Sequence, residues 1–387
     1  YSWRGADFRN LNYLINDFPT IKEIRLLKNY RSTQRILDAA YGVIGRNVSH
    51  PILKLTATGE EGQKILVYQA RDEKDEARYI LEEIVNDGDF SKFAVLYRTN
   101  AQSRVLEEAF IRKGIPYVLV GGTKFYERRE IKDVLSYLKV IANPADEVSW
   151  ERIEKVGKRR RAEFERWREE TGRDHDLAKM KTEDSLRGAL KAADYLSLYN
   201  EKDEQDLMRL ENIKELLSVA TEFPDLTAFL ENVALVQSEA QVVMGSDNVV
   251  TLMTMHAAKG LEFDSVFLVG MEEGLFPHSR SMMDSDQMEE ERRLMYVGMT
   301  RAKKKLYMTY AQARLYFGQR DSSIPSRFLA EVPSHLTESV GVGRKGEILG
   351  PQGGRKIVED WEVGVDEETK KKVQKLIEED WAEIDNW

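Results

Sequence analysis

The sequence predicts an α/β protein in which a helical segment interrupts a mostly parallel sheet with helices on both faces. From Ile24 to about Asn143, short apolar runs alternate with helical periods, which is the pattern of βαβ units. From about Glu147 to Asp247 the strand-like runs disappear, and apolar residues recur at helical spacing. Strand-like runs then return, so we expect one sheet to be assembled from two separated stretches of the chain.

The first stretch contains three predicted strands, with the sequences EIRLL, KILVYQA and FAVLYR. Each is a short apolar run rich in residues that favour strands. Ser32 is a good N-cap for a helix with the sequence STQRILDAAYGVIGRN. Asn100 is placed to cap a second helix that stops at Gly114. Strands and helices alternate along this stretch, as expected for a parallel sheet with helices on both faces.

The later part of the chain supplies the helical insertion and the rest of the sheet. LMRLENIKELLSVATEF and LTAFLENVAL have helical periodicity, and VVTLMTM, SVFLVGM and KKLYMTY are predicted strands around the helix EEERRLMYVGMTRA. A Gly-rich segment beyond Pro333 is typical of a linker. We predict a sheet domain from residues 1–146 and 248–337, a helical insertion at 147–247, a linker at 338–358 and an acidic helical tail at 359–387.

Composition excludes several classes of protein. No apolar run approaches the roughly 18 to 20 residues of a membrane span, the first residues lack a signal-peptide core, and there are no cysteines. The five histidines are scattered without ligand spacing. We therefore expect a cytoplasmic protein with no structural metal.

Charge is unevenly distributed along the chain. The formal net charge is -9, and residues 359–387 carry 11 acidic and 4 basic residues, which leaves -2 for everything before them. Residues 154–168 (EKVGKRRRAEFERWR) carry 7 basic and 3 acidic residues. This basic stretch is suited either to phosphate contacts or to a solvated helix face.

Two segments place aromatic rings beside arginines. In YSWRGAD, Tyr1, Trp3 and Arg4 lie in a polar turn, where rings can stack on unpaired bases. In LLKNYRS, Tyr30 and Arg31 follow a predicted strand, at the edge where α/β sheets bind ligands. An aromatic ring can cover a nucleobase, and a guanidinium can bind a phosphate in a bidentate manner.

Two further segments carry polar side chains next to strands. TMHAAKGLEF contributes His256, Lys259 and Glu262 among small residues, and EEERRLMYVGMTRA places Arg301 in the last turn of a predicted helix. A fixed arginine at the end of an element suits an arginine finger. Each segment alone also has an ordinary structural interpretation, as a core aromatic, a turn or a helix C-terminal charge. Their joint occurrence favours a functional site.

Together these segments resemble a family. WRGAD, NYRS, VLYRTNAQSRVLEEAF, HAAKGLEF and YVGMTRA resemble motifs III, IV, IVa, V and VI of the UvrD/PcrA/Rep-type superfamily-one DNA helicases, in family order. The resemblance covers most of the chain to about Thr337. It implies that the sheet is the second RecA-like motor domain, the insertion its accessory subdomain, and the whole protein an ATP-dependent enzyme that moves 3′ to 5′ along single-stranded DNA.

The resemblance also implies roles for individual residues. Tyr30 corresponds to the residue that stacks on adenine, Glu262 to the ribose contact, and Arg31 and Arg301 to the catalytic arginines at the γ-phosphate. Contacts with single-stranded DNA are implied for Tyr1, Trp3, Arg98, Asn100, Thr254 and His256, with Arg4 coupling the DNA and nucleotide sites.

The chain departs from the family's pattern in three places. It has no G-x-x-x-x-G-K-[ST] phosphate loop and no Asp-Glu magnesium motif, so we expect the N-terminal RecA-like half to hold ATP phosphates and Mg²⁺ and this chain alone to be inactive. The insertion is shorter than in the family, with EKVGKRRRAEF where a Pro-Lys-Arg-Gly-Ile-Gly turn is expected. DWEVGV resembles the opening of a small β domain, but an acidic helix follows it.

Three functions remain to be compared. The first is the motor half of a repair or replication helicase, with single-stranded DNA, single-strand to duplex junctions and the N-terminal half as partners. The second is a non-catalytic DNA-binding or regulatory module, and the third is a scaffold whose acidic tail binds a protein. Arg31 and Arg301 favour the first, because a pure binding module needs no arginines directed at a phosphate.

Overall fold

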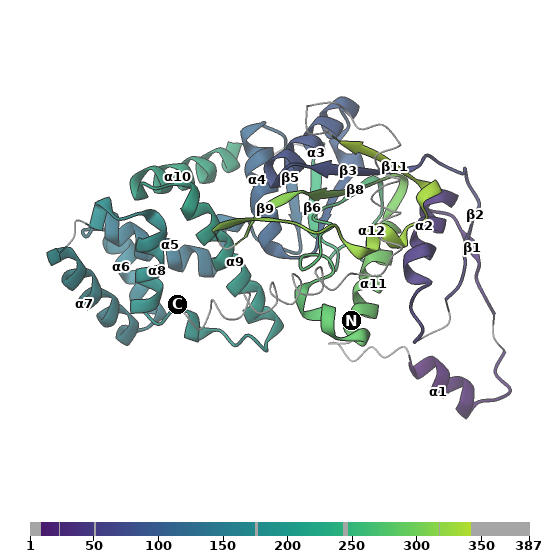
Figure 1. Cartoon of the computed structure of the whole chain (residues 1–387), viewed down its shortest axis with the longest axis horizontal. Coiled ribbons are helices and arrows are strands. Elements are labelled where there is room, and N and C mark those ends of the chain that lie inside the picture. Colours follow the sequence, from purple (N-terminus) through teal and green to yellow (C-terminus); the bar gives the residue numbers. More distant parts are fainter. Residues whose placement is uncertain are drawn as a thin grey trace.

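A seven-stranded parallel sheet forms the centre of the computed structural model (Figure 1). The structure describes residues 9–22, 24–49, 52–174, 177–242, 247–316 and 318–341. The strands lie in the order β11-β3-β8-β7-β4-β6-β5, and all neighbours are parallel. Their bounds are β3 Ile65–Ala70, β4 Phe93–Tyr97, β5 Tyr117–Val120, β6 Val250–Thr254, β7 Phe263–Leu268, β8 Ala302–Ala311 and β11 Thr337–Gly341.

Helices cover both faces of the sheet, which confirms the predicted fold class. Because side chains alternate along a strand, Leu96 of β4 joins one core and its neighbour Val95 the other. Every residue of β4 is buried, as expected for a strand covered on both faces. Three helices pack on the Leu96 face and two on the Val95 face: α2 Gln34–Ile44, α11 Ser285–Met299 and α12 Arg327–Glu331, against α3 Glu73–Asp87 and α4 Ser103–Arg112.

The remaining large helices form a body beside the sheet, seen on the left of Figure 1. They are α5 Arg129–Ala142, α6 Glu147–Val156, α7 Lys158–Asp174, α8 Thr182–Ala192, α9 Glu204–Glu222 and α10 Leu226–Val242. This helical body has its own core, in which Tyr137, Phe164, Leu216 and Phe229 are fully buried. Within the described residues, no helix is long and apolar enough to cross a membrane.

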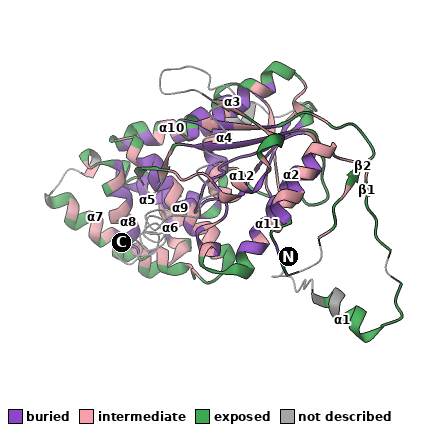
Figure 2. Cartoon of the chain, turned by 45° about the vertical axis from the view of Figure 1, so that its right-hand side comes forward, coloured by how far each residue is buried: buried purple, intermediate pink, exposed green. Residues whose placement is uncertain are grey.

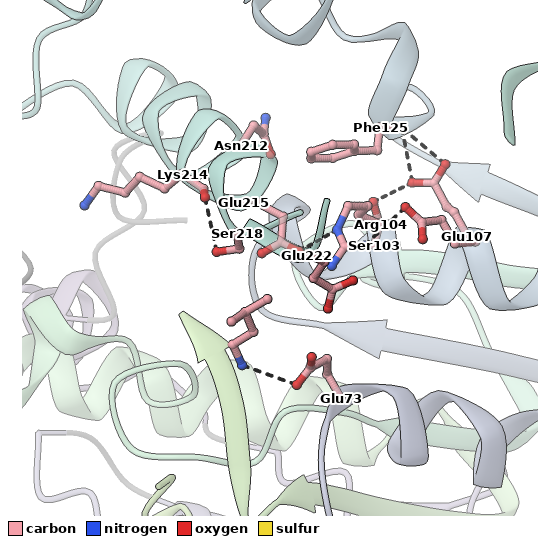
Figure 3. A network of polar contacts seen from close by, with 12 residues as sticks. Glu73, Ser103, Arg104, Glu107, Phe125, Asn212, Lys214, Glu215, Ser218 and Glu222 are labelled. Carbon is pink, nitrogen blue, oxygen red and sulfur yellow. Dashed lines mark hydrogen bonds and ion pairs between the residues drawn. The ribbon is translucent and has the colours of Figure 1, made fainter. Parts of the chain in front are cut away.

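Helix α9 joins the helical body to the sheet through polar contacts (Figure 3). Arg104 of α4 donates from Nε to Glu215 of α9 at 2.6 Å, and both side chains are largely buried. One turn further along α9, Ser218 Oγ accepts from the backbone N–H of Gly318 at 3.1 Å. Gly318 lies in the turn of a hairpin formed by β9 Ala313–Tyr316 and β10 Gln319–Ser322. Charged and polar groups therefore fix how the helical body meets the sheet.

The first described residues project away from the sheet. Helix α1 Arg9–Asp17 and the two-residue strands β1 Lys28–Asn29 and β2 Thr56–Ala57 lie at the right of Figure 1, and α1 is exposed in Figure 2. The predicted strand EIRLL does not join the sheet, since Ile24 and Leu26 are 71% and 81% exposed. Apolar strand formers become strands only on a half-buried pleated surface, and the described chain offers this run none.

Local predictions at helix starts and strand edges also differ from the structure. Helix α2 begins after Thr33, and Ser32 donates its hydroxyl to the Ala302 carbonyl instead of capping the helix. Asn100 opens a short 3₁₀ helix, Asn100–Gln102, that precedes α4. The first residues of the predicted linker belong to the edge strand β11. Tertiary contacts determine the local structure at Ser32 and at β11. At Asn100 a local capping box between Thr99 and Gln102 begins the 3₁₀ helix.

Candidate functional site

Four of the predicted site residues meet at the amino ends of β7 and β8. Glu262 and Arg301 come immediately before these adjacent parallel strands. The loop that carries Tyr30 and Arg31 reaches the same place because Ser32 Oγ donates to the Ala302 carbonyl at 2.7 Å. The sequence predicted a position just after a strand of the sheet, which is wrong, since the site lies at the opposite edge.

Local hydrogen bonds hold the Tyr30 loop in shape. The side-chain oxygen of Asn29 accepts from the backbone N–H groups of Arg31 and Ser32, both at 2.9 Å. Thr33 then donates its backbone N–H to the carbonyl of Lys303 at 3.1 Å. Gly62, with φ +83°, lies so close to Thr33 that a Cβ there would be 2.4 Å from its side chain. Hydrogen bonds and the close packing of Gly62 against Thr33 therefore fix the conformation of this loop.

Arg301 is a buried cation held by neutral oxygens. Its Nε donates to the Val297 carbonyl at 2.9 Å and Nη1 to the Leu261 carbonyl at 3.1 Å. Its Nη2 donates to Thr300 Oγ1 at 3.1 Å. Within the described residues no carboxylate forms a salt bridge with Arg301, and burial together with the charge of Arg31 lowers its pKa. The guanidinium keeps its charge and orientation without a counter-ion.

The position of Arg301 differs slightly from the prediction. Helix α11 ends at Met299 and Thr300 is its C-cap, so Arg301 lies just beyond the last turn. Its bond to Val297 still fastens the side chain to that turn. This arrangement gives a charged group a fixed direction.

Arg31 and Glu262 form the exposed part of the cluster. Arg31 Nε donates to Glu262 Oε2 at 2.7 Å, and Lys303 Nζ lies 3.1 Å from Glu262 Oε1. The hydrogen bond from Arg31, followed by that from Lys303, holds the pKa of the Glu262 carboxyl below its ordinary value. Beside them Tyr30 is 81% exposed, so its ring is open to stacking. Two cations thus hold one carboxylate.

A second group of predicted residues lies at the other edge of the sheet. Arg98 and Asn100 follow the carboxyl end of β4, and Thr254 and His256 lie at the end of the adjacent strand β6. Thr254 Oγ1 accepts from the N–H of Ala257 at 3.3 Å, so it shapes the turn. The group around Arg301 and the group around Arg98 therefore lie at opposite ends of the strands.

Arg98 is engaged in a buried ion pair that the sequence did not predict. Its Nε and Nη2 donate to both oxygens of Glu291 on α11, with the shortest distance 2.8 Å. Glu291 also accepts from the backbone N–H of His278 at 3.1 Å. Burial and the nearby Arg98 charge lower the pKa of His256 to about 4. At neutral pH this group therefore contains a neutral histidine and a paired arginine.

The remaining candidates are the first residues of the chain and the basic stretch. Tyr1, Trp3 and Arg4 lie outside the described residues. In the basic stretch on α7, four arginines form ion pairs within the helical body: Arg159 and Arg160 with Asp194, Arg161 with Glu154, and Arg166 with Glu163. These pairs favour the solvated helix face over the phosphate contact.

Lys303 is a member of the first cluster that the sequence analysis missed. Lys303 is the second residue of β8, directly after the segment that carries Arg301, and the sequence analysis singled out no site residue beyond Arg301. Glu291 carried no local signal, since its partner Arg98 is far away in the sequence.

The chain is similar to known proteins along most of its length. The chain matches the UvrD-like helicase C-terminal domain over residues 24–171 and 155–313. It is 40% identical over 403 residues to the ATP-dependent DNA helicase PcrA of Staphylococcus epidermidis, covering 91% of this chain and 55% of that protein. Identity to the protein of the same name is 39% in Staphylococcus aureus, with 89% and 54% covered, and 40% in Leuconostoc citreum, with 89% and 53% covered.

The chain also matches solved structures. The C-terminal domain of a possible DNA helicase from Lactobacillus plantarum WCFS1 matches 80% of this chain and 98% of its own, with a TM-score of 0.36 and 13% sequence identity. The chain spans about half the length of the curated relatives it matches. The matched residues include the loop of Tyr30 and Arg31, and they extend through Glu262 to Arg301. The chain therefore belongs to the UvrD-like helicase C-terminal domain family.

Proposed function

We propose that this chain is the C-terminal motor half of an ATP-dependent 3′ to 5′ single-stranded DNA translocase and helicase. The curated relatives are named ATP-dependent DNA helicases, and the chain spans about half of their length. The activity therefore belongs to the longer protein, in which an N-terminal RecA-like half contributes to the same site. DNA repair or replication in the cytoplasm is the setting that we propose.

The single observation that carries this proposal is the environment of Arg301. In the part of the chain that the structure describes, this buried guanidinium has three neutral acceptors and no paired carboxylate, which makes it a site for an anion. Arg31 lies close enough to lower its pKa, and the exposed ring of Tyr30 is next in the chain. A flat ring beside two cations suits a nucleoside triphosphate, which offers a base and phosphates together.

Each residue has a chemical role in this proposal. Tyr30 stacks on adenine, Glu262 accepts from the ribose, and Arg31 binds the terminal phosphate. Arg301 acts as the arginine finger, because its fixed charge stabilises negative charge that develops as the terminal phosphoryl group is transferred. The chain contains no phosphate loop, so the N-terminal half supplies that loop and the ligands of Mg²⁺, which neutralises phosphate charge when bound.

The other edge of the sheet is the proposed path of DNA. Asn100, Thr254 and His256 lie there, together with Arg98, at the ends of adjacent strands. Tyr1, Trp3 and Arg4 complete this group as stacking and coupling residues. Single-stranded DNA and its junctions with duplex are the proposed partners, and the acidic tail is a proposed site for a protein.

A non-catalytic DNA-binding module is the alternative function. It accounts for the stacking residues but assigns no role to a buried arginine without a counter-ion. Because an unpaired buried charge destabilises a fold, its presence favours the enzymatic proposal.

Replacing the proposed finger tests the function. In the protein that includes the N-terminal half, Arg301→Ala is expected to lower kcat by about 10³-fold, or about 4 kcal/mol of transition-state stabilisation. The measurement is steady-state ATP turnover with saturating single-stranded DNA, with KM determined in parallel. An increase in KM with unchanged kcat would contradict the assignment. Arg301→Lys, which keeps the charge but loses the planar fork, distinguishes geometry from charge alone.

A further inference from the structure

The ion pair between Arg31 and Glu262 has a third member. Lys303 Nζ lies 3.1 Å from Glu262 Oε1, while Arg31 Nε occupies Glu262 Oε2 at 2.7 Å. The two oxygens of one carboxylate are therefore held by two different cations. The arrangement is partly exposed, with 31% of the Arg31 side chain, 35% of Lys303 and 45% of Glu262 accessible.

The two cations differ in how they are anchored. Lys303 is the second residue of β8, and its carbonyl also accepts from the backbone N–H of Thr33. Arg31 lies on a loop, and among the described residues its guanidinium reaches, apart from Glu262, only the Thr300 carbonyl, at 3.5 Å. Lys303 is thus fixed to the sheet edge, whereas Arg31 is held mainly by the carboxylate itself.

Both residues of the Arg31 pair are needed elsewhere in the proposed function, on which this inference rests. The donors that Arg31 uses for Glu262 become available to a phosphate when its guanidinium turns away from the carboxylate. The same movement frees acceptor sites on Glu262 Oε2 for a ribose hydroxyl. A single movement of Arg31 satisfies both needs, provided that the carboxylate stays ionised and oriented while Arg31 is away.

We propose that Lys303 is the positioning residue that keeps Glu262 ready for the ribose when Arg31 moves to the phosphate. Lys303 holds Oε1 throughout, and the departure of Arg31 leaves Oε2 as the acceptor for the sugar. Exposed ion pairs of this kind contribute little to folding. The function of Lys303 is therefore to be found in nucleotide recognition and not in stability.

Discrimination between sugars is the property that tests this inference. In the protein that includes the N-terminal half, KM for ATP is compared with KM for 2′,3′-dideoxy-ATP, which lacks the hydroxyls that Glu262 would bind. Lys303→Met is expected to weaken the preference for ATP by about tenfold, the usual effect of losing a hydrogen bond to a charged group. The kcat at saturating ATP is expected to stay within about twofold of wild type, because Arg301 and Arg31 remain. Lys303→Arg is expected to restore the preference.

The neighbouring residue provides a matched control. Lys304 Nζ pairs with Asp264 at 2.7 Å and its side chain is 69% exposed, so Lys304→Met removes the same charge next to the site. It is expected to leave the preference for ATP unchanged. Equal preference in Lys303→Met and wild type would overturn the inference while leaving the proposed function intact. Failure of the wild-type protein to bind either nucleotide would overturn both.

Discussion

At the residue scale, the guanidinium groups of Arg301 and Arg98 have different partners and therefore differ in their availability to an anion. Arg301 is held by three neutral acceptors and keeps its charge available, whereas Arg98 is neutralised by the buried Glu291. An anion can bind beside Arg301 without breaking an ion pair. A DNA phosphate that recruits Arg98 has to compete with Glu291, and leaving a buried carboxylate unpaired is costly. The role proposed for Arg98 therefore requires a rearrangement of this pair.

His256 gives a prediction about pH. Its pKa is about 4 in the folded protein, against an ordinary value of about 6.5, because burial and the charge of Arg98 oppose protonation. Between these two pH values the unfolded chain binds more protons than the folded one, so the free energy of unfolding falls as pH decreases. We expect His256→Gln to lose less stability than wild type between pH 6.5 and 4, by on the order of 2 to 3 kcal/mol.

Urea unfolding at several pH values measures this difference. The comparison with the variant is necessary because buried carboxyls titrate in the same range. Parallel curves for wild type and His256→Gln would show that the histidine is solvated in the folded state.

The residues of the proposed nucleotide site were predictable as a set but not in their contacts. The resemblance pointed to Tyr30, Arg31, Glu262 and Arg301, and the structure brings these four together. The sequence analysis missed Lys303, which lies at the start of β8 two residues after Arg301. The pairing of Arg98 with Glu291 was beyond local patterns, since it depends on how α11 crosses the end of β4.

At the scale of elements, helix α9 is the main connection between the helical body and the sheet. Arg104 is bound by Glu215 of α9 and by Glu108 of its own helix, at 2.6 and 3.1 Å. Burial raises the pKa of Glu215 while Arg104 opposes the increase. Figure 3 shows this group between α9 and the sheet, and Lys74 pairs with Glu222 near the end of α9.

Removal of the buried arginine is expected to weaken this connection. Arg104→Ala leaves the largely buried Glu215 without its paired cation and removes one of the two cations near Glu108. We expect a loss of about 3 to 5 kcal/mol in the free energy of unfolding. Lys74→Ala breaks the more exposed pair with Glu222 and is expected to cost no more than about 1 kcal/mol. Denaturant titration of both variants checks the prediction, and losses of similar size would contradict it.

Elements covered on both faces were the ones that the sequence predicted best. KILVYQA, FAVLYR, VVTLMTM and KKLYMTY correspond to central strands, because burial on two sides demands continuous apolar runs. The four-residue β5 and the edge strand β11 were missed. Edge strands are covered less completely, so their residues carry a weaker apolar signal.

At the scale of the whole molecule, the sheet stays continuous despite the helical insertion. The insertion leaves after β5 and returns at β6, and these strands are neighbours, with Tyr117 opposite Val250. Helix α5 lies before the predicted insertion boundary but contributes Tyr137 and Leu138 to the core of the helical body. Only packing shows which core this helix joins.

DNA-stimulated ATP turnover tests the central claim most directly. It is to be measured for the chain alone and for the same chain joined to an N-terminal half that carries a phosphate loop. Since this chain contributes arginines and a stacking ring but no phosphate loop, we expect no turnover above background for the chain alone and clear stimulation by single-stranded DNA in the joined protein. Turnover by the chain alone, or a joined protein that binds DNA without hydrolysing ATP, would contradict the account.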